Sequence, residues 1–150
     1  MTIKNNLNKT IQNSFNSKKS LVNQFKKIEL AIKTLYETIK KNKKIMICGN
    51  GGSAADAQHL SAELLVRLRP NVNRRPFPIM PLAMDTSTIT ACSNDYDFKY
   101  LFSRNLEAFG NNGDALIIIT TSGNSKNIIE VSRLAKKKKI PIIGFLGNNG

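Results

Sequence analysis

The sequence contains little cysteine and no long apolar run, and each absence excludes a class of protein. Its 150 residues include two cysteines, Cys48 and Cys92, which cannot form the disulfide framework of a small secreted domain. No hydrophobic stretch reaches the length needed to cross a bilayer, and the polar N-terminus lacks the apolar core of a signal peptide. We therefore expect a soluble, cytoplasmic protein with no membrane partner.

Two nucleotide-binding signatures are incomplete or missing. The run from Gly49 to Ala54 fits the dinucleotide pattern G-x-G-x-x-A, but that fingerprint expects an acid about 20 residues further on, and position 69 is Arg. No Gly-Lys-Ser/Thr triplet follows the glycines, which excludes a P-loop nucleotide triphosphatase. The glycine turn therefore fits a sugar phosphate better than a nicotinamide cofactor.

The chain is strongly basic, with a formal net charge of +13, but the excess of lysine is concentrated in residues 1–44 and not at the glycine turn. This distribution favours a solvated lysine-rich surface over a nucleic-acid patch. Lys136 to Lys139 are expected to form the exposed C-terminal end of a helix, where cations suit the helix dipole.

Hydrophobic periodicity divides the chain into a helical segment and an alternating segment. Apolar residues recur at intervals of three and four over residues 3–41, which predicts helices whose apolar stripe needs a partner, in part another subunit. Strands and helices then alternate, which predicts a parallel, helix-covered α/β sheet of the doubly wound, flavodoxin-like kind over 44–150. The expected strands are 44–48, 79–84, 115–120 and 141–146, and the expected helices are 53–68, with Ser53 as N-cap, 86–93, 97–109 and 124–138.

The printed sequence stops directly after the last predicted strand. In this fold a strand leads into another helix, so we expect residues 1–150 to be a single domain that lacks about 30 to 45 residues, one further crossover unit with its closing helix.

Two strand-to-helix turns carry the candidate ligand groups. The first follows strand 44–48 and offers Asn50 and Ser53 as side-chain donors, and the second is the run Thr121-Ser122-Gly123-Asn124-Ser125. Hydroxyls and exposed backbone N–H groups at a helix start can surround a phosphate without a lysine. An ordinary Ser or Asn cap would account for one or two of these residues. The five together predict a pocket for a small phosphorylated molecule.

The only histidine, His59, lies four residues before Glu63, so the two share one helix face, with Asp56 on the same side. A lone helical histidine is usually a packed or half-exposed residue. Glu63 stands in an apolar stretch, where a carboxylate is paired, bound to metal or used as a base. Asp95, after Asn94, has two interpretations, a cap for the next helix or a ligand residue.

These motifs together resemble the SIS (sugar isomerase) domain, and more narrowly the bacterial phosphoheptose isomerase family. The resemblance runs from about residue 40 to the end of the chain. Its most specific part is the run Cys48–His59. Further matches lie at 62–64, 93–96, 102–104 and 121–125.

The resemblance implies an isomerase that converts sedoheptulose 7-phosphate to D-glycero-D-manno-heptose 7-phosphate for ADP-heptose and lipopolysaccharide core synthesis. It also implies a homotetramer whose N-terminal helices pack between subunits, with active sites at the interfaces. Glu63 would be the catalytic base, and His59 and Glu63 would be ligands of one zinc ion per subunit. The implied substrate contacts are Asn50, Gly51, Gly52, Ser53, Glu63, Asn94, Asp95, Thr120, Thr121, Ser122 and Ser125.

The chain departs from the family where it ends, because the family's acid histidine and a metal-contacting glutamine belong to a later helix. We therefore expect the 150-residue form to be inactive or nearly so, with at most half a metal site. Two alternatives remain open: a non-catalytic relative of the DnaA initiator-associating type, and a sugar-phosphate sensor domain. Glu63, the Asn94-Asp95 pair and residues 102–104 favour the isomerase.

Overall fold

A computed structural model describes residues 2–83 and 85–147, which fall into two compact units that divide between Lys33 and Thr34. The N-terminal unit holds helix α1 (Ile3–Ser20), the short 3₁₀ helix η1 (Leu21–Gln24) and the first half of α2 (Phe25–Lys40). The hydroxyl of Thr2 caps α1 by accepting a hydrogen bond from the backbone N–H of Asn5, at 3.3 Å. The expectation of helix over residues 3–41 is confirmed.

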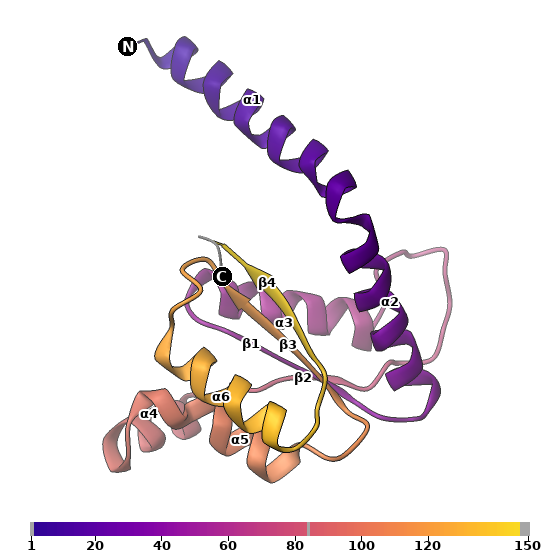
Figure 1. Cartoon of the computed structure of the whole chain (residues 1–150), viewed down its shortest axis with the longest axis vertical. Coiled ribbons are helices and arrows are strands. Elements are labelled where there is room, and N and C mark those ends of the chain that lie inside the picture. The colour runs from indigo at the N-terminus through magenta and orange to yellow at the C-terminus, as the bar shows by residue number, and fades with distance from the viewer. Residues whose placement is uncertain (1, 84, 148–150) are drawn as a thin grey trace. The chain divides into compact units, whose positions relative to one another are not determined.

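The second unit is built on a parallel sheet, as predicted (Figure 1). Among the described residues the strand order is β2-β1-β3-β4, with β1 in the interior of the sheet. From β1 the sheet therefore extends to β2 on one side and to β3 and then β4 on the other. The strands are β1 (Ile45–Gly49), β2 (Ile79–Pro81), β3 (Ala115–Thr120) and β4 (Ile142–Leu146).

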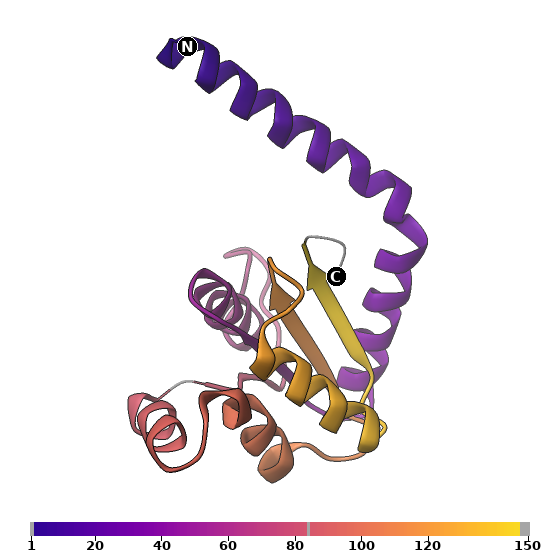
Figure 2. The same ribbon diagram turned by 60° about the vertical axis from the view of Figure 1, so that its left-hand side comes forward.

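Helices cover both faces of the sheet (Figure 2). On one face α3 (Gly52–Leu65) packs with the second half of α2, and on the other lie α4 (Thr86–Asp95), the 3₁₀ helix η2 (Phe98–Tyr100), α5 (Leu101–Phe109) and α6 (Lys126–Lys137). Burial on both faces explains why the strands are continuous apolar runs, since alternate residues of a strand point to opposite sides. Ile45 and Ile47 join the α3 core, whereas Met46 and Cys48 join the α5–α6 core.

Several predicted boundaries differ from the structure. The N-cap of α3 is Gly51 and not Ser53, because the tight turn after β1 places helical geometry one residue earlier. The same helix ends at Leu65 and not at residue 68. Strand β2 ends at Pro81 and not at residue 84, although the N–H of Leu82 still donates to the carbonyl of Ile47 in β1 at 2.8 Å.

The helix predicted over 97–109 is divided, because Asp97 caps a separate 3₁₀ turn by accepting the N–H of Lys99 at 2.7 Å. The capping aspartate is therefore Asp97, and the prediction that Asp95 could cap the next helix is wrong, since Asp95 is the last residue of α4.

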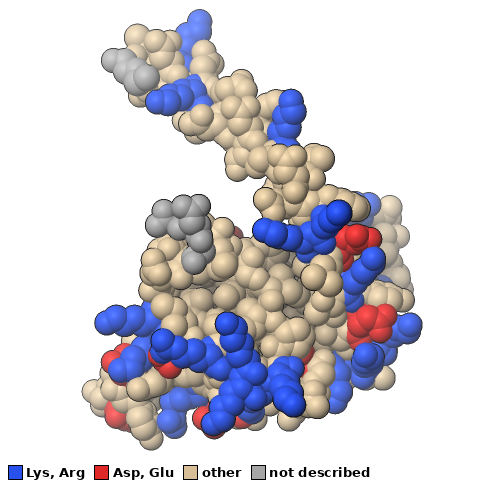
Figure 3. All heavy atoms as spheres, in the orientation of Figure 1, with Lys and Arg blue, Asp and Glu red and all other residues tan. Residues whose placement is uncertain are grey.

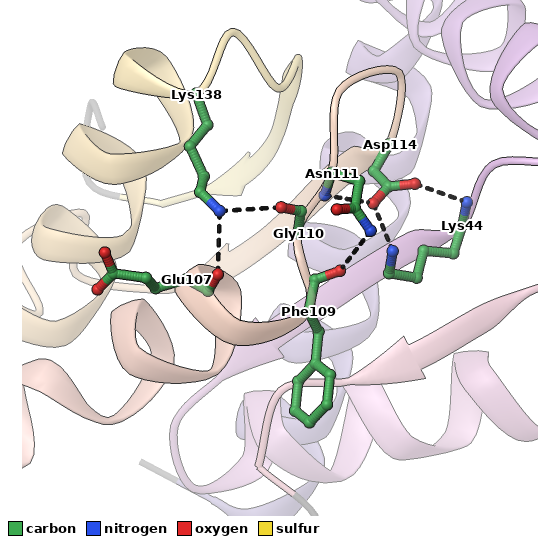
Figure 4. A network of polar contacts seen from close by, with 7 residues as sticks. All are labelled: Lys44, Glu107, Phe109, Gly110, Asn111, Asp114 and Lys138. Carbon is green, nitrogen blue, oxygen red and sulfur yellow. Dashed lines mark hydrogen bonds and ion pairs between the residues drawn. The ribbon is translucent and has the colours of Figure 1, made fainter.

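A buried carboxylate joins the starting ends of β1 and β3 (Figure 4). Asp114, with 1% of its surface exposed, accepts the backbone N–H of Lys44 at 3.0 Å, the Lys44 ammonium at 2.6 Å and the N–H of Asn111 at 2.8 Å. Beside it, the ammonium of Lys138 donates to the carbonyls of Glu107 and Gly110 at the end of α5. These contacts lie at the end of the sheet opposite the glycine turn.

Positive charge gathers over α5 and α6 in the view of Figure 3, whereas the surface over β4 is mostly uncharged. Lys136 and Lys137 occupy the last turn of α6, as expected for cations near the negative end of a helix dipole. No helix among residues 2–83 and 85–147 has the length and apolar character to cross a bilayer.

Candidate functional site

The two polar turns begin side by side because their strands are neighbours. Strands β1 and β3 pair in parallel with Gly49 opposite Ile119, so the turns after them leave the same edge of the sheet. The strand order also reverses direction between β1 and β3. In open α/β sheets this switch point, at the carboxyl ends of the strands, is where ligands bind. The structure therefore brings together the two turns that the sequence singled out.

The turn after β1 requires glycine at two positions for different reasons. Gly51 has a φ of 55°, in the left-handed region that residues with a Cβ rarely adopt. At Gly49 a Cβ would lie 2.6 Å from the carbonyl oxygen of Ser53, so the start of α3 packs directly on the strand end. At Gly52 a Cβ would meet nothing within 4 Å, so the protein's own packing does not account for this glycine. The backbone there is open to a ligand.

The turn after β3 collects three hydroxyl groups. The Oγ1 of Thr120, a residue 5% exposed, lies 3.4 Å from the Oγ atoms of both Ser122 and Ser125. Ser122 Oγ also accepts the backbone N–H of Asn124 at 3.2 Å. Ser125 is the N-cap of α6, but its side chain makes no capping bond. The first N–H groups of a helix have no acceptor within it, so α6 presents unpaired donors beside these hydroxyls.

The side chains of Asn50 and Asn127 connect the two turns. Asn50 Nδ2 donates to Asn127 Oδ1 at 2.9 Å, and Asn127 Nδ2 donates back to Asn50 Oδ1 at 2.8 Å. Asn127 is the second residue of α6 and is 3% exposed. Asn50 could be named from the sequence but Asn127 could not, because no local pattern marks a contact across 77 residues.

His59 and Glu63 form the predicted pair on one face of α3. His59 Nε2 lies 3.5 Å from Glu63 Oε1, and the two side chains are 77% and 27% exposed. Asp56 on the same helix is exposed. The helix carries Glu63 away from the two turns, however, since it lies 11 residues after Gly52 and a helix rises ~1.5 Å per residue, about 16 Å in all.

The far end of α3 is held by Arg74, a half-buried residue. Its guanidinium donates to the carbonyls of Leu64 at 2.7 Å and Glu63 at 2.6 Å, and it lies over the Phe77 ring at 4.3 Å. These bonds satisfy carbonyls that a helix end leaves without partners. They also explain why the helix stops at Leu65, since the loop that follows returns to cap it. A cation shortly after a helix end was the only sequence signal.

Asn94 and Asp95 lie at the end of α4, which packs against α5 and η2. Both are exposed, and Asn94 Nδ2 donates to Asp95 Oδ1 at 2.8 Å. Among residues 2–83 and 85–147, no hydrogen bond or ion pair joins Asn94 or Asp95 to either turn. Their assignment as substrate ligands stays a prediction.

His59 and Glu63 are the candidate ligands of a metal ion on α3. A zinc site needs three or four ligands, and His59 with Glu63 supplies two. Within the part of the chain that the structure describes, no group of three His, Cys, Asp or Glu side chains could hold a metal. The only nearby thiol, Cys48, is buried beneath the glycine turn, and burial raises its pKa, which keeps it protonated. The described residues of one copy therefore do not fit a complete zinc site.

Comparison with known proteins agrees with this architecture. The model of the SIS domain family matches residues 11–147. Fold and site thus define a protein of the SIS class.

Two relatives and one solved structure show which family within the SIS class the chain resembles. The chain is 49% identical over 129 residues to a phosphoheptose isomerase of Campylobacter concisus, covering 86% of this chain and 67% of the relative. It is 40% identical over 151 residues to that of Clostridium acetobutylicum, covering 99% and 76%. A solved phosphoheptose isomerase structure from Francisella tularensis superposes with a TM-score of 0.92 at 33% identity, covering 100% of this chain and 78% of that one. The chain belongs to the phosphoheptose isomerase family.

Proposed function

We propose that this protein converts sedoheptulose 7-phosphate to D-glycero-D-manno-heptose 7-phosphate, the step that leads toward ADP-heptose and the lipopolysaccharide core, in the cytoplasm. The observation that carries the proposal is the meeting of two polar turns at the β1–β3 switch point, where Thr120, Ser122 and Ser125 gather at the start of α6. Membership of the phosphoheptose isomerase family supports the same substrate.

The phosphate is assigned to the turn after β3. A phosphate dianion would accept hydrogen bonds from Thr121 and the three gathered hydroxyls and from the free N–H groups of α6, and the positive end of the helix dipole would favour its charge. Asn50, Gly51, Gly52 and Ser53 would then contact the sugar. Because this binding is remote from the reacting carbons, its energy orients the substrate for reaction.

Glu63 is assigned as the base. Its carboxylate takes the proton from C1 of the ketose while O2 gains a proton, which gives a cis-enediol. The proton is then delivered to C2 as O1–H loses its own, which gives the aldose. The proton transfer between the two oxygens needs an acid that we do not find among the described residues. We therefore propose that a polypeptide of these 150 residues alone turns over slowly or not at all.

The base and the phosphate turn that serve one substrate are assigned to different copies of the chain. An extended seven-carbon sugar phosphate spans on the order of 10 Å, from bond lengths of about 1.5 Å, whereas Glu63 lies about 16 Å along α3 from the glycine turn of its own copy. If Glu63 of one copy faces the phosphate turn of another, the substrate no longer has to span the distance between the two within one copy. Such a shared site would also give His59 and Glu63 access to further zinc ligands.

A homotetramer would supply the shared sites. In the N-terminal unit α1 has no buried residue, and its apolar stripe stands exposed, with Ile3 at 89%, Leu7 at 57%, Ile11 at 59% and Phe15 at 59%. Apolar side chains in such a row gain about 25 cal/mol per Å² when covered. Phe15→Asp should therefore lower the mass measured by analytical ultracentrifugation from tetramer toward monomer.

Subunit mixing tests the proposal with the full natural chain. Glu63→Gln and the turn variant Ser125→Ala should each lose most turnover of sedoheptulose 7-phosphate. Mixed oligomers of the two would regain up to about a quarter of wild-type activity, because some shared sites contain neither substitution. Glu107→Gln, an exposed α5 control, should keep full activity. Mixed oligomers that stay inactive while the wild type is active would refute the shared site. An inactive wild type would refute the isomerase activity and favour a non-catalytic SIS protein.

A further inference from the structure

Asn50 and Asn127 are joined by a reciprocal pair of hydrogen bonds, in which one edge of each carboxamide faces the other. Each carboxamide donates one N–H and accepts at its oxygen, at 2.9 and 2.8 Å. This arrangement is a closed ring of two hydrogen bonds, which fixes both the distance and the relative rotation of the two amide planes. A single bond would leave that rotation free.

The burial of Asn127 requires an explanation beyond local helix structure. Asparagine is a poor residue inside a helix and is favoured at caps, where its side chain bonds to nearby backbone. The cap position of α6 is taken by Ser125, and the Asn127 side chain bonds instead to a residue 77 positions earlier. Burying an amide is costly unless it is hydrogen-bonded. Its partner, and not its own helix, therefore accounts for its position.

The Asn50–Asn127 pair joins the two turns at a point after the last paired residues of β1 and β3. The last paired residues of β1 and β3 are Gly49 and Ile119, after which the backbones separate. Asn50 is the next residue of the first turn, and Asn127 lies in the helix that begins at the second. The ring leaves the second N–H of the half-buried Asn50 pointing away from Asn127 and available to a ligand.

We propose that Asn127 is a positioning residue of the sugar-phosphate site. Its carboxamide holds that of Asn50 in the orientation that contacts the sugar, and it keeps the glycine turn in register with the phosphate turn. This inference rests on the proposed function, because it assigns Asn50 a contact with the substrate.

A double-mutant cycle tests the inference on the full natural chain. The variants are Asn127→Leu, which keeps the branched shape and number of heavy atoms but removes both bonds, Asn50→Ala, and the two combined. We expect Asn127→Leu to lower kcat/KM for sedoheptulose 7-phosphate by roughly tenfold, the scale of one to two net hydrogen bonds. When Asn127→Leu is added to Asn50→Ala, kcat/KM should fall by less than about a further twofold, because substitutions of residues that act through one another do not have additive effects.

The matched control is Asn105→Leu, because Asn105 is a partly buried helical asparagine whose side chain, among the residues that the structure describes, bonds only within its own helix, at Leu101 O. It should leave kcat/KM within about twofold of wild type. A two-dimensional NMR spectrum gives a second readout. Asn127→Leu should shift the side-chain amide signals of Asn50, whereas Asn105→Leu should not.

Each outcome decides one claim. Additive losses in the cycle, or no loss in Asn127→Leu, with an active wild type, would overturn the positioning role and leave the proposed function standing. A wild type that neither binds nor converts the sugar phosphate would overturn the proposed function, and this inference with it. If Asn127→Leu does not fold, Asn127→Ser, which removes the carboxamide but keeps a hydroxyl, takes its place in the cycle with the same expectations.

Discussion

The substitution Asp114→Asn should destabilise the fold in a way that depends on pH. The carboxylate of Asp114 is 1% exposed and accepts two hydrogen bonds from Lys44 and one from Asn111. Burial disfavours its charge and acts to raise its pKa, but the bonds from Lys44 and Asn111 outweigh that effect and hold the pKa of Asp114 below its ordinary value. The charged form therefore stabilises the folded protein.

The magnitude follows from what the substitution leaves behind. Removing one partner of a buried ion pair costs about 3–5 kcal/mol. The Lys44 side chain is 25% exposed and regains part of its hydration, so the low end, about 3 kcal/mol, applies here. For a domain of this size each kcal/mol shifts Tm by roughly 2–4 °C, which gives a fall of about 6–12 °C.

Thermal unfolding followed by circular dichroism measures this effect between pH 7 and pH 3. Because the pKa is lowered in the folded state, the stabilisation is fully present above the unfolded value of about 3.9 and is lost as pH falls through the folded value. The Tm difference should thus hold from pH 7 to about 5 and shrink below about 4. Glu107→Gln is the control, since its side chain points away from the network in Figure 4. Equal melting temperatures at pH 7, or a difference that does not shrink between pH 5 and pH 3, would refute the reasoning.

Three further predictions concern stability and reactivity. Arg74→Gln removes two hydrogen bonds to the end of α3 and should lower the free energy of unfolding, measured by urea titration, by about 2 kcal/mol. An unchanged urea midpoint would count against this prediction. Lys139→Gly should raise the free energy of unfolding by about 0.5–1 kcal/mol, because Lys139 has a φ of 56° after α6. Lys137→Gly replaces the last helical residue of α6 and should lower it, by at most about 1 kcal/mol. Cys48 should react with a thiol reagent only after unfolding, because it is 2% exposed and its thiol pKa is raised, and fast reaction in the native protein would contradict its burial.

The sheet could be predicted because its strands are buried on both faces. Residues 115–120 are almost all apolar, and β3 has these bounds in the structure. The other strands are shifted or shortened at their ends, where the hydrophobic pattern is weak and hydrogen bonds decide. The helical segment was predictable for the same reason, since its apolar spacing is regular over its whole length.

Contacts between distant parts of the chain could not be predicted. No local signature marks the bonds that join Asn127 to Asn50 and Asp114 to Lys44, because these residues come near one another only on folding. Lys44 and Asp114, for example, are separated by 70 positions and meet because β1 and β3 pair. A sequence pattern reports periodicity and local turns, whereas a polar side chain's partner depends on the tertiary arrangement.

The candidate site was predicted in its parts but not in its geometry. The two turns follow neighbouring strands and meet as expected. The family resemblance grouped Glu63 with the two turns as a substrate contact, but three turns of helix place it toward the other end of α3. The His59–Glu63 pair itself is confirmed, at 3.5 Å. Its role as base stays a prediction.

The most direct test of the central claim follows the proton that the isomerase would move. The full natural chain, with and without zinc, is incubated with sedoheptulose 7-phosphate in deuterated water, and the product is observed by NMR. The account predicts an aldose that carries deuterium at C2, formed by the wild type and by Glu107→Gln but not by a folded Glu63→Gln. A folded oligomer that binds the sugar phosphate without exchanging any proton would contradict the account, and so would undiminished exchange in Glu63→Gln.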